Sequence, residues 1–515
     1  MALVWGKRWS SWQASILTVS STWHERCGYK TTPMSRTSVF RLPILAGLYG
    51  AGDALIKGGH YLLLIWLGTR FHANEYATLV LAVGVFQLIT LILLGGLPEA
   101  IYSLMNYSRF KHNASRLFRS ARTYQLLLSA IVSIPILIIF YAIESRNKQG
   151  MEWHAIPLIY LYSFIMARYS LMVVINQLAD NHRQAMLYRY LLPGFGLSFA
   201  IIGIIVFGNH YEIYFLGNVC AFFGVYPLLR KLDGNAIDAK TDREVFRDLN
   251  RLGIPLILVS LSGWITGLGL TVIVSGVVAR STIAQYGMII SINAALLIAY
   301  NSFNQVWVPI FFNKSRDVTG EQLDHVNSAA NDLLNLVVIN IVVCMYLFSK
   351  ELFALLKMSD HKDICRYLGI VLVSHCFLFL YYRYVNYYFL SKRNTVFMVE
   401  IILSGVLGLA ATAALIAAWG DVGVYWGYTI TMALRSIMVA AYIIVIFKKK
   451  ILDYLPVISA VILGGLMLLQ AQDTPVSYRV FAILAIGTAS GIHATRIWKL
   501  LTVQGRSPLL RPDDL

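Results

Sequence analysis

The sequence predicts an all-α polytopic membrane protein with about fourteen transmembrane helices. Hydrophobic residues make up 57% of the 515 residues, and charged residues only 13%. From about residue 45 onward, apolar stretches of roughly the 17–25 residues that span a bilayer follow one another. No connection between these stretches is long enough to fold alone. We therefore expect the functional groups to lie within the membrane.

The predicted spans fall into groups of six, six and two. The first group covers approximately 45–68, 76–98, 121–143, 155–176, 191–208 and 211–229. A hydrophilic stretch at 230–251 precedes the second group, at 254–279, 283–308, 331–349, 364–390, 395–418 and 422–447. The last pair lies near 454–470 and 478–497.

This grouping divides the chain into four regions. We expect a leader or a mis-called start at 1–33, an N-terminal lobe at 34–230, a C-terminal lobe at 231–450, and a last region at 451–515 holding two spans and a cytoplasmic tail. The leader contains four tryptophans but no long apolar core before a cleavage site, so we do not interpret it as a signal peptide. Met34, which opens a short basic approach to the first span, is the start that we expect.

The distribution of charge predicts the orientation in the membrane. The net charge is +17, and a cytoplasmic N-terminus places roughly 30 of the 43 Lys and Arg residues on the cytoplasmic side. This pattern predicts cytoplasmic N- and C-termini and does not suggest a nucleic-acid surface. One predicted outward connection disagrees with it by carrying Lys350, Lys357, Lys362 and Arg366. The five cysteines show no CxxC spacing, so no metal site or disulfide framework is expected.

The two groups of six spans share an internal repeat. Tyr76 and Pro98 bracket the second span, and Tyr286 and Pro309 bracket the eighth at almost the same spacing. Such repeats are typical of transporters built from two related halves.

Three segments resemble a known family. WLGTRFHANEYATLVLA at 66–82, GGLPEAIYSLMNYSR at 95–109 and NRLGIPLILVSLSGWI at 250–265 are similar to span junctions of Wzx-type polysaccharide and O-antigen flippases, which belong to the multidrug/oligosaccharidyl-lipid/polysaccharide exporter superfamily. The chain departs from the pattern at Ala77, where a glycine is usual, and at 267–274, which lacks an Asp-Arg pair.

The resemblance implies two six-helix lobes in a V around a central cavity, followed by two C-terminal helices. It implies that the protein flips a polyprenyl-pyrophosphate-linked oligosaccharide from the cytoplasmic to the outer leaflet by alternating access, for surface polysaccharide biosynthesis. The expected location is the cell inner (plasma) membrane. Expected partners are this lipid-linked oligosaccharide, membrane lipids, a polysaccharide polymerase and export machinery.

The first span carries the densest group of candidate residues. Asp53, Lys57 and His60 are spaced to share one helix face. Charged groups inside spans are costly, at about 2.5–3.5 kcal/mol each, and usually serve a function. We expect Lys57 and His60 to meet substrate phosphate and Asp53 to take part in ion coupling. The alternative is a self-neutralising Asp53–Lys57 pair.

Three arginines lie inside predicted spans, Arg168, Arg383 and Arg435. Their planar guanidinium groups suit bidentate binding of phosphate, so we predict that they are cavity cations. The alternative is that they reach a lipid headgroup at a span end. Tyrosines around Arg383 fit either a sugar-binding lining or an interfacial aromatic belt. Glu400 is a candidate for ion coupling, with an interfacial carboxylate as the alternative.

Two other functions compete with flipping. A multidrug extruder of the same superfamily would favour an acidic cavity, whereas the predicted spans carry mostly basic groups. A membrane polysaccharide polymerase or ligase would usually need a long outward loop, and none is predicted. The sequence contains no nucleotide-binding loop, nucleophile elbow or metal-spaced His/Cys cluster, so we expect neither an enzyme nor a cofactor.

Overall fold

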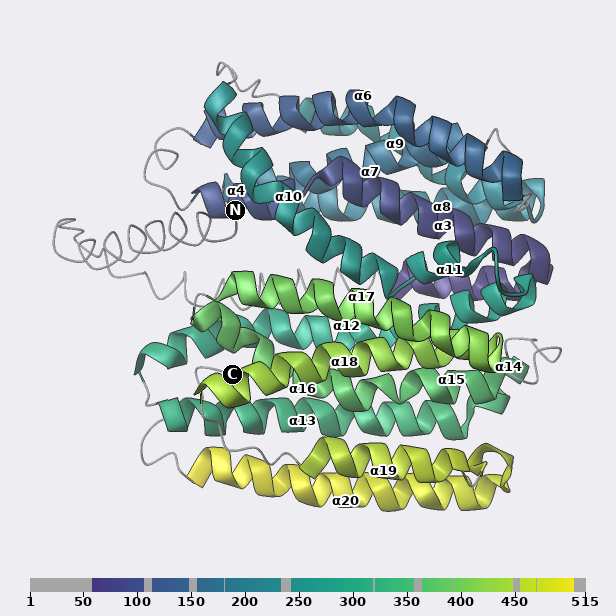
Figure 1. Ribbon diagram of the computed structural model, residues 1–515, viewed down its shortest axis with the longest axis vertical. Helices are drawn as coiled ribbons and strands as arrows, with labels where there is room; N and C mark the ends of the chain where they lie inside the picture. Colours follow the sequence, from purple (N-terminus) through teal and green to yellow (C-terminus); the bar gives the residue numbers. More distant parts are fainter. Residues whose placement is uncertain are drawn as a thin grey trace. The chain divides into compact units, whose positions relative to one another are not determined.

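The computed structural model describes residues 58–105, 114–147, 155–179, 181–232, 242–317, 320–355, 364–391, 393–447, 454–468 and 470–503. All of them belong to one compact unit, Gly50–Leu515. Throughout these ranges the regular secondary structure is helical, and no strand occurs in them (Figure 1). The predicted all-α class is therefore confirmed.

The N-terminal half begins, within the described residues, with a helix over 58–70. It continues with α3 (Ala73–Leu94), α4 (Leu97–Met105), α6 (Ala114–Asn147), α7 (Ala155–Leu178), α8 (His182–Phe207) and α9 (Tyr211–Leu232). We use the term N-terminal half for these helices and C-terminal half for everything from residue 242 onward.

The C-terminal half opens with α10 (Arg243–Ile265), α11 (Gly269–Val274), α12 (Arg280–Asp317), α13 (Gly320–Leu347) and α14 (Ser349–Leu355). It continues with α15 (Ile364–Leu372), α16 (Ser374–Leu390), α17 (Asn394–Trp419) and α18 (Val422–Phe447). The last elements are α19 (Tyr454–Leu468), a 3₁₀ turn η1 (Ala471–Asp473) and α20 (Val476–Val503), and both α19 and α20 pack against α13.

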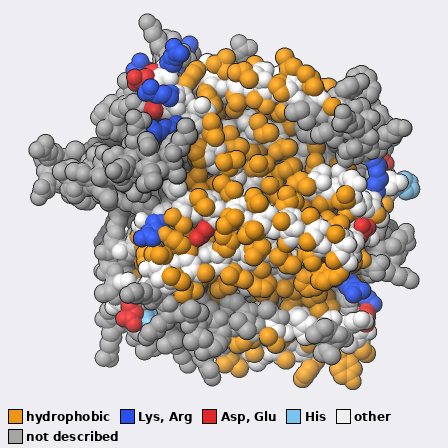
Figure 2. Space-filling model, in the orientation of Figure 1, with side chains coloured by type: hydrophobic (Ala, Val, Ile, Leu, Met, Phe, Trp, Pro, Cys, Tyr) orange, Lys and Arg blue, Asp and Glu red, His pale blue; other side chains and the backbone are white. Residues whose placement is uncertain are grey.

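The composition of the helices fits a lipid environment. Among the described residues, nine helical segments are long and apolar enough to cross a membrane. Large apolar side chains such as Ile131, Phe207 and Phe481 are 70%, 73% and 72% exposed. Figure 2 shows hydrophobic side chains over the middle of one face, with most of the visible charged side chains toward its left and right edges. Nine of the predicted spans coincide with these segments, while the total of fourteen crossings stays a prediction.

Two consecutive glycines break the second predicted span. Gly95 and Gly96 have φ values of 58° and 64°, a left-handed conformation that suits glycine. The Gly95 amide closes α3 by donating to the carbonyl groups of Ile92 and Leu91. Pro98 then lies in the first turn of α4, where a backbone amide would have no acceptor within the helix. The break places Glu99 at the start of a new helix.

The predicted span at 364–390 is also interrupted, between α15 and α16. The amide of Cys376 donates to the carbonyl of Val373, which is a shorter connection than the α-helical pattern. Thr429 donates its hydroxyl to the Ile370 carbonyl group at 2.7 Å. Side chains thus satisfy backbone groups that the irregularity releases, as a position inside a membrane requires.

The two halves meet through close backbone contacts that only glycine permits. A Cβ atom on Gly84 of α3 would lie 2.9 Å from the Leu268 carbonyl oxygen, and one on Gly287 of α12 would lie 2.3 Å from the Val80 side chain. The Trp264 indole donates to the Gly84 carbonyl oxygen at 2.8 Å. These contacts hold α3 against α10, α11 and α12.

Candidate functional site

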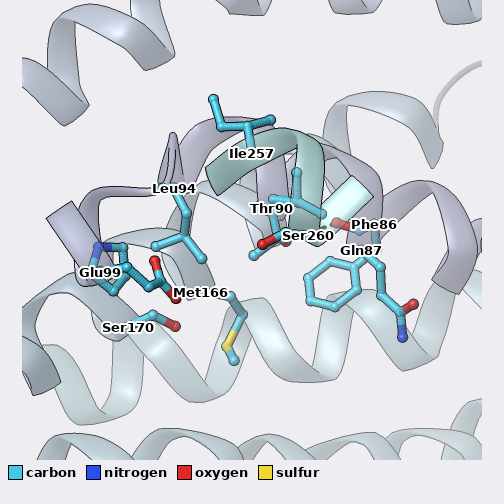
Figure 3. A pocket seen from close by; sticks show the side chains of 12 residues that line it. Phe86, Gln87, Thr90, Leu94, Glu99, Met166, Ser170, Ile257 and Ser260 are labelled. Atoms are coloured by element: carbon cyan, nitrogen blue, oxygen red, sulfur yellow. Dashed lines mark hydrogen bonds between the residues drawn. The ribbon is translucent and has the colours of Figure 1, made fainter. Parts of the chain in front are cut away.

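A cavity of about 380 Å³ lies between the two halves. It is bounded by α3, α4 and α7 from the N-terminal half and by α10 from the C-terminal half. Its lining residues are Phe86, Gln87, Thr90, Leu91, Leu94, Gly96, Pro98, Glu99, Met166, Ser170, Ile257 and Ser260 (Figure 3).

The lining is largely apolar with a few polar groups. The Thr90 hydroxyl donates to the Phe86 carbonyl group at 2.8 Å, so its hydrogen is already engaged. Glu99 supplies the single carboxylate of the lining, and no Lys, Arg or His belongs to it. In the view of Figure 3, Glu99 and Gln87 lie toward opposite ends of the lining, with Leu94 and Met166 between them. An apolar wall with one carboxylate is suited to an amphipathic ligand, and the charge favours a cationic group.

The predicted site in the first span is described only in part. Asp53 and Lys57 lie outside the described residues. His60 is partly buried, and its Nε2 lies 2.8 Å from the hydroxyl of Tyr214 on α9. The two rings are 5.7 Å apart between centroids. In this arrangement His60 is engaged within the N-terminal half.

Arg168 is directed from α7 toward α6. Its Nη1 lies 3.4 Å from both the Gln125 side-chain oxygen and the Arg122 carbonyl oxygen, with donation to each. These hydrogen bonds to α6 give the Arg168 guanidinium group partners within the protein, in the middle of its predicted span.

Arg383 is neutralised within the C-terminal half. Its Nη1 lies 3.4 Å from the carboxylate of Asp332 on α13, and its Nη2 donates to the Ser328 hydroxyl. The guanidinium carbon also lies 5.8 Å from the ring centres of Phe379 and Tyr384. Only 11% of the Arg383 side chain is exposed, so the pair is mostly buried.

Arg435 occupies the middle of α18, and its surroundings differ. Its Nη2 donates to the carbonyl oxygen and the hydroxyl of Ser262 on α10, at 3.3 and 3.1 Å. Its Nε is buried without a hydrogen bond. Across the described ranges, no Asp or Glu forms an ion pair with this guanidinium. Arg435 therefore retains a positive charge inside the helix bundle.

Glu400 lies on α17 beside the tyrosines that follow Arg383. The Tyr388 hydroxyl donates to its carboxylate. Tyr388 is fully buried, and its ring stacks on Tyr442 at 5.2 Å between centroids. Tyr387 similarly donates to Asp324 on α13 at 2.5 Å. These two tyrosines are packed between helices.

The structure thus separates the described candidate residues from one another. His60, Arg168, Arg383, Arg435 and Glu400 lie in different helix contacts, and none of them lines the cavity. The cavity residues Gln87, Thr90 and Ser260 were not predicted, although polar residues in apolar spans gave a weak signal. Glu99 was visible at a span end, but its place in the cavity lining depends on the break at Gly95 and Gly96.

Comparison of the sequence with known proteins finds no matching family and no similar curated protein. Solved structures with the same fold include three transporters. An inward-facing multidrug resistance transporter of the MATE family, in the MOP superfamily, is 15% identical with a TM-score of 0.61, covering 78% of this chain and 96% of that chain. The MATE multidrug transporter DinF-BH in complex with R6G is 13% identical with a TM-score of 0.56, covering 83% and 99%.

The third is the eukaryotic MATE transporter AtDTX14, 12% identical with a TM-score of 0.55, covering 82% of this chain and 99% of that chain. At these identities the likeness shows the fold alone. The chain has a MATE-like transporter fold.

Proposed function

We propose that this protein is a transporter of the inner membrane that flips an anionic, lipid-linked oligosaccharide by alternating access. The fold shared with three transporters favours transport over a polymerase or ligase. The observation that carries the choice of an anionic substrate is Arg435. A mid-span guanidinium with no carboxylate partner among the described residues is costly unless an anion uses it.

The surroundings of Arg435 suit a pyrophosphate-linked sugar. An arginine binds phosphate oxygens with two parallel donors. Nε of Arg435 is buried without a hydrogen bond, so a phosphate group would reach it only after the surrounding helices move apart, as alternating access requires. The proposal retains cytoplasmic N- and C-termini, two lobes, and cooperation with a polysaccharide polymerase and export machinery. His60 and Arg168 are secondary candidates, because each already has a protein partner.

The test is a flipping assay in proteoliposomes. A fluorescent polyprenyl-pyrophosphate saccharide would be placed in both leaflets, and a membrane-impermeant quencher would report the fraction that reaches the outer leaflet. Wild type should flip the lipid, Arg435→Met should reduce the rate at least tenfold, and Arg393→Met should behave as wild type. Arg393 is a matched control because it is exposed at the start of α17 and bonds to Tyr442. Wild-type flipping in Arg435→Met would contradict the proposal.

A second candidate function is extrusion of amphipathic cations. The observation that favours it is the cavity, which combines apolar walls with the carboxylate of Glu99 and contains no basic side chain. One of the solved structures with the same fold is a complex with R6G. Uptake of a lipophilic dye cation into inverted vesicles, and its loss in Glu99→Gln, would favour this function over flipping.

A further inference from the structure

A second polar cluster lies inside the C-terminal half, away from the cavity. Its centre is His375, near the middle of the predicted span Ile364–Leu390 and 1% exposed. His375 is the second residue of α16, immediately after the break that separates α16 from α15. Broken helices inside transporters are common places for substrate and coupling-ion sites.

The hydrogen bonds around His375 define which ring nitrogen carries the proton. Its Nε2 lies 2.8 Å from Oδ1 of Asn293 on α12. The amide group of Asn293 donates in turn to the Tyr428 hydroxyl on α18 at 2.6 Å. Because Asn293 Oδ1 can only accept, Nε2 of the neutral ring carries the hydrogen. The basic lone pair is then on Nδ1, which is buried without a hydrogen bond.

The helices around His375 hold it in place. The ring of Tyr300 on α12 stacks on the imidazole with planes 6° apart and centroids at 5.8 Å. Tyr300 also donates to the backbone carbonyl group of His375 at 3.4 Å, next to the helix break. A tyrosine face at this distance can stabilise a protonated ring by a cation–π interaction. Nδ1 of His375 can therefore accept a proton, and the ring face of Tyr300 would stabilise the positive charge.

The proton affinity of His375 depends on the charged and titratable groups of the helices that pack against α16. Arg435 on α18 interacts electrostatically with Tyr428, which accepts the hydrogen bond from Asn293. The carboxylates Asp332 and Glu400 are engaged with Arg383 and Tyr388. Other titratable side chains on these helices include Tyr300 and Tyr286 on α12, Asp324, His325, Cys344 and Tyr346 on α13, Cys365, Arg366 and Tyr367 on α15, Tyr425 and Tyr428 on α18, and Cys376, Tyr381 and Tyr382 on α16 itself.

We propose that His375 is a proton-binding site that couples a conformational change at the α15–α16 break to the proton gradient. A proton can drive such a change only if it binds one conformation more tightly than the other. In the described conformation a hydrogen on Nδ1 would find no acceptor, and the new charge would be buried away from water. This conformation therefore holds the neutral ring. Protonation favours a different arrangement, in which movement at the break gives Nδ1 an acceptor.

The proposal rests on the chain being a transporter but is independent of which substrate it moves. Histidine suits the task because its ordinary pKa lies near neutrality. A proton delivered to Nδ1 leaves the ring with a hydrogen on each nitrogen and a charge of +1. Its release restores the neutral ring, so a full cycle moves one proton.

The first test measures conformation against pH in nanodiscs. Spin labels would be attached at exposed Ile131 on α6 and Val406 on α17, one in each half, after replacement of the five native cysteines. We expect the distance distribution of the otherwise unchanged protein to shift as the pH falls through the histidine range. His375→Gln keeps a donor for Asn293 but cannot titrate, so its distribution should not respond. His493→Gln, at an exposed position on α20, should respond like the parent.

A second variant tests the proposal even if the His375→Gln protein does not fold. Asn293→Asp places a carboxylate beside the imidazole, and an adjacent negative charge raises the proton affinity of histidine by about 1–3 pH units. The conformational shift should therefore occur at a higher pH by that amount. An unresponsive parent protein, a pH response retained in His375→Gln, or an unmoved midpoint in Asn293→Asp would each overturn the proposal.

A flipping assay separates this proposal from the proposed function. With the fluorescent polyprenyl-pyrophosphate saccharide, His375→Gln should equilibrate the lipid without a gradient but lose the extra accumulation that a pH gradient produces in wild type. Accumulation that remains gradient-driven in His375→Gln would overturn the proton site. If wild type does not move this lipid at all, the proposed function fails, while the pH-dependent distances still test His375.

Discussion

Gly96 and Gly253 meet backbone to backbone where α10 crosses the junction of α3 and α4. A Cβ atom built on Gly96 would lie 2.4 Å from the Gly253 carbonyl oxygen, and one on Gly253 would lie 2.4 Å from the Gly95 carbonyl oxygen. Gly96 also lines the cavity. The first half of the chain and the second therefore touch, at one edge of the cavity, through glycines that leave no room for a side chain.

Gly253→Ala should destabilise the protein by about 1–3 kcal/mol, the usual effect of adding a methyl group to a well-packed contact. Thermal unfolding of the purified protein in detergent would measure the change. Gly263→Ala is the matched control on the same helix, because a Cβ there meets nothing within 4 Å. The control should be neutral or gain up to about 1 kcal/mol from helix propensity. Equal melting temperatures for Gly253→Ala and wild type would show that α10 can shift away from Gly95 and Gly96 without loss of stability.

Arg435→Met and Arg383→Met should change stability in opposite ways. Arg435→Met removes a mid-span charge without a carboxylate partner among the described residues, so the protein should be as stable as wild type or more so. Arg383→Met removes the guanidinium group that pairs with the mostly buried Asp332 carboxylate and should cost up to about 3–5 kcal/mol. Thermal unfolding of both variants tests this. A stable Arg383→Met protein would mean that water reaches Asp332.

Adding Asp332→Asn to Arg383→Met should recover most of the loss. A double-mutant cycle would isolate the pair from the packing of the arginine chain against Phe379 and Tyr384.

Glu351→Gln should weaken the protein at neutral pH but not in acid. Glu351 on α14 accepts hydrogen bonds from Arg479 on α20 at 2.5 and 2.7 Å, and these bonds lower the pKa of its carboxyl group. Because the folded pKa lies below the ordinary value, the stabilisation is present above that value and is lost as the pH falls through the folded pKa. Melting temperatures of wild type and Glu351→Gln should converge as the pH is lowered below 4.5, the usual value for this group.

The exposure of Glu351 limits the size of this effect. Its side chain is 46% exposed, so solvent screens the pair, and the neutral-pH difference should be about 1 kcal/mol or less. A difference that persists unchanged in acid would mean that the charge of Glu351 contributes nothing.

Glu99→Gln should weaken binding of a lipophilic cation such as rhodamine 6G by about tenfold, which corresponds to about 1.4 kcal/mol for the lost charge. Fluorescence titration of the purified protein would measure it. Glu75→Gln is the control, because Glu75 lies in the first turn of α3 and pairs with His210 at 3.7 Å, away from the cavity lining. Equal affinity in Glu99→Gln and wild type would remove the observation that favours cation extrusion.

Hydrophobic run length predicted the helices well but not their interruptions. The span expected at 76–98 corresponds to α3 followed by α4, because Gly95 and Gly96 adopt a left-handed conformation. The span expected at 364–390 is broken at Val373, where the sequence has no Gly or Pro that would predict a break. Length and apolarity report that a segment can cross a membrane, whereas breaks depend on partners such as Thr429, which is distant in sequence.

The candidate site was harder to predict because pairing is a long-range property. Sequence identified Arg383 and Arg435 as equivalent mid-span cations. The structure distinguishes them through Asp332 and Ser262, which are 51 and 173 positions away in the chain. His60 and Tyr214 are 154 positions apart. No local pattern encodes such contacts, so the sequence could nominate charged residues without indicating which of them already have partners.

The size of the cavity bears on how fast a large cargo can move. About 380 Å³ is near the lower end of the roughly 300–1,000 Å³ typical of pockets for drug-sized molecules. A unit of several sugars is bulkier than such a ligand. Its passage would require α10 to leave α3 and α4, either at Gly96 and Gly253 or near Gly84 and Leu268. For such a cargo the separation of these backbones would be a step of every transport cycle.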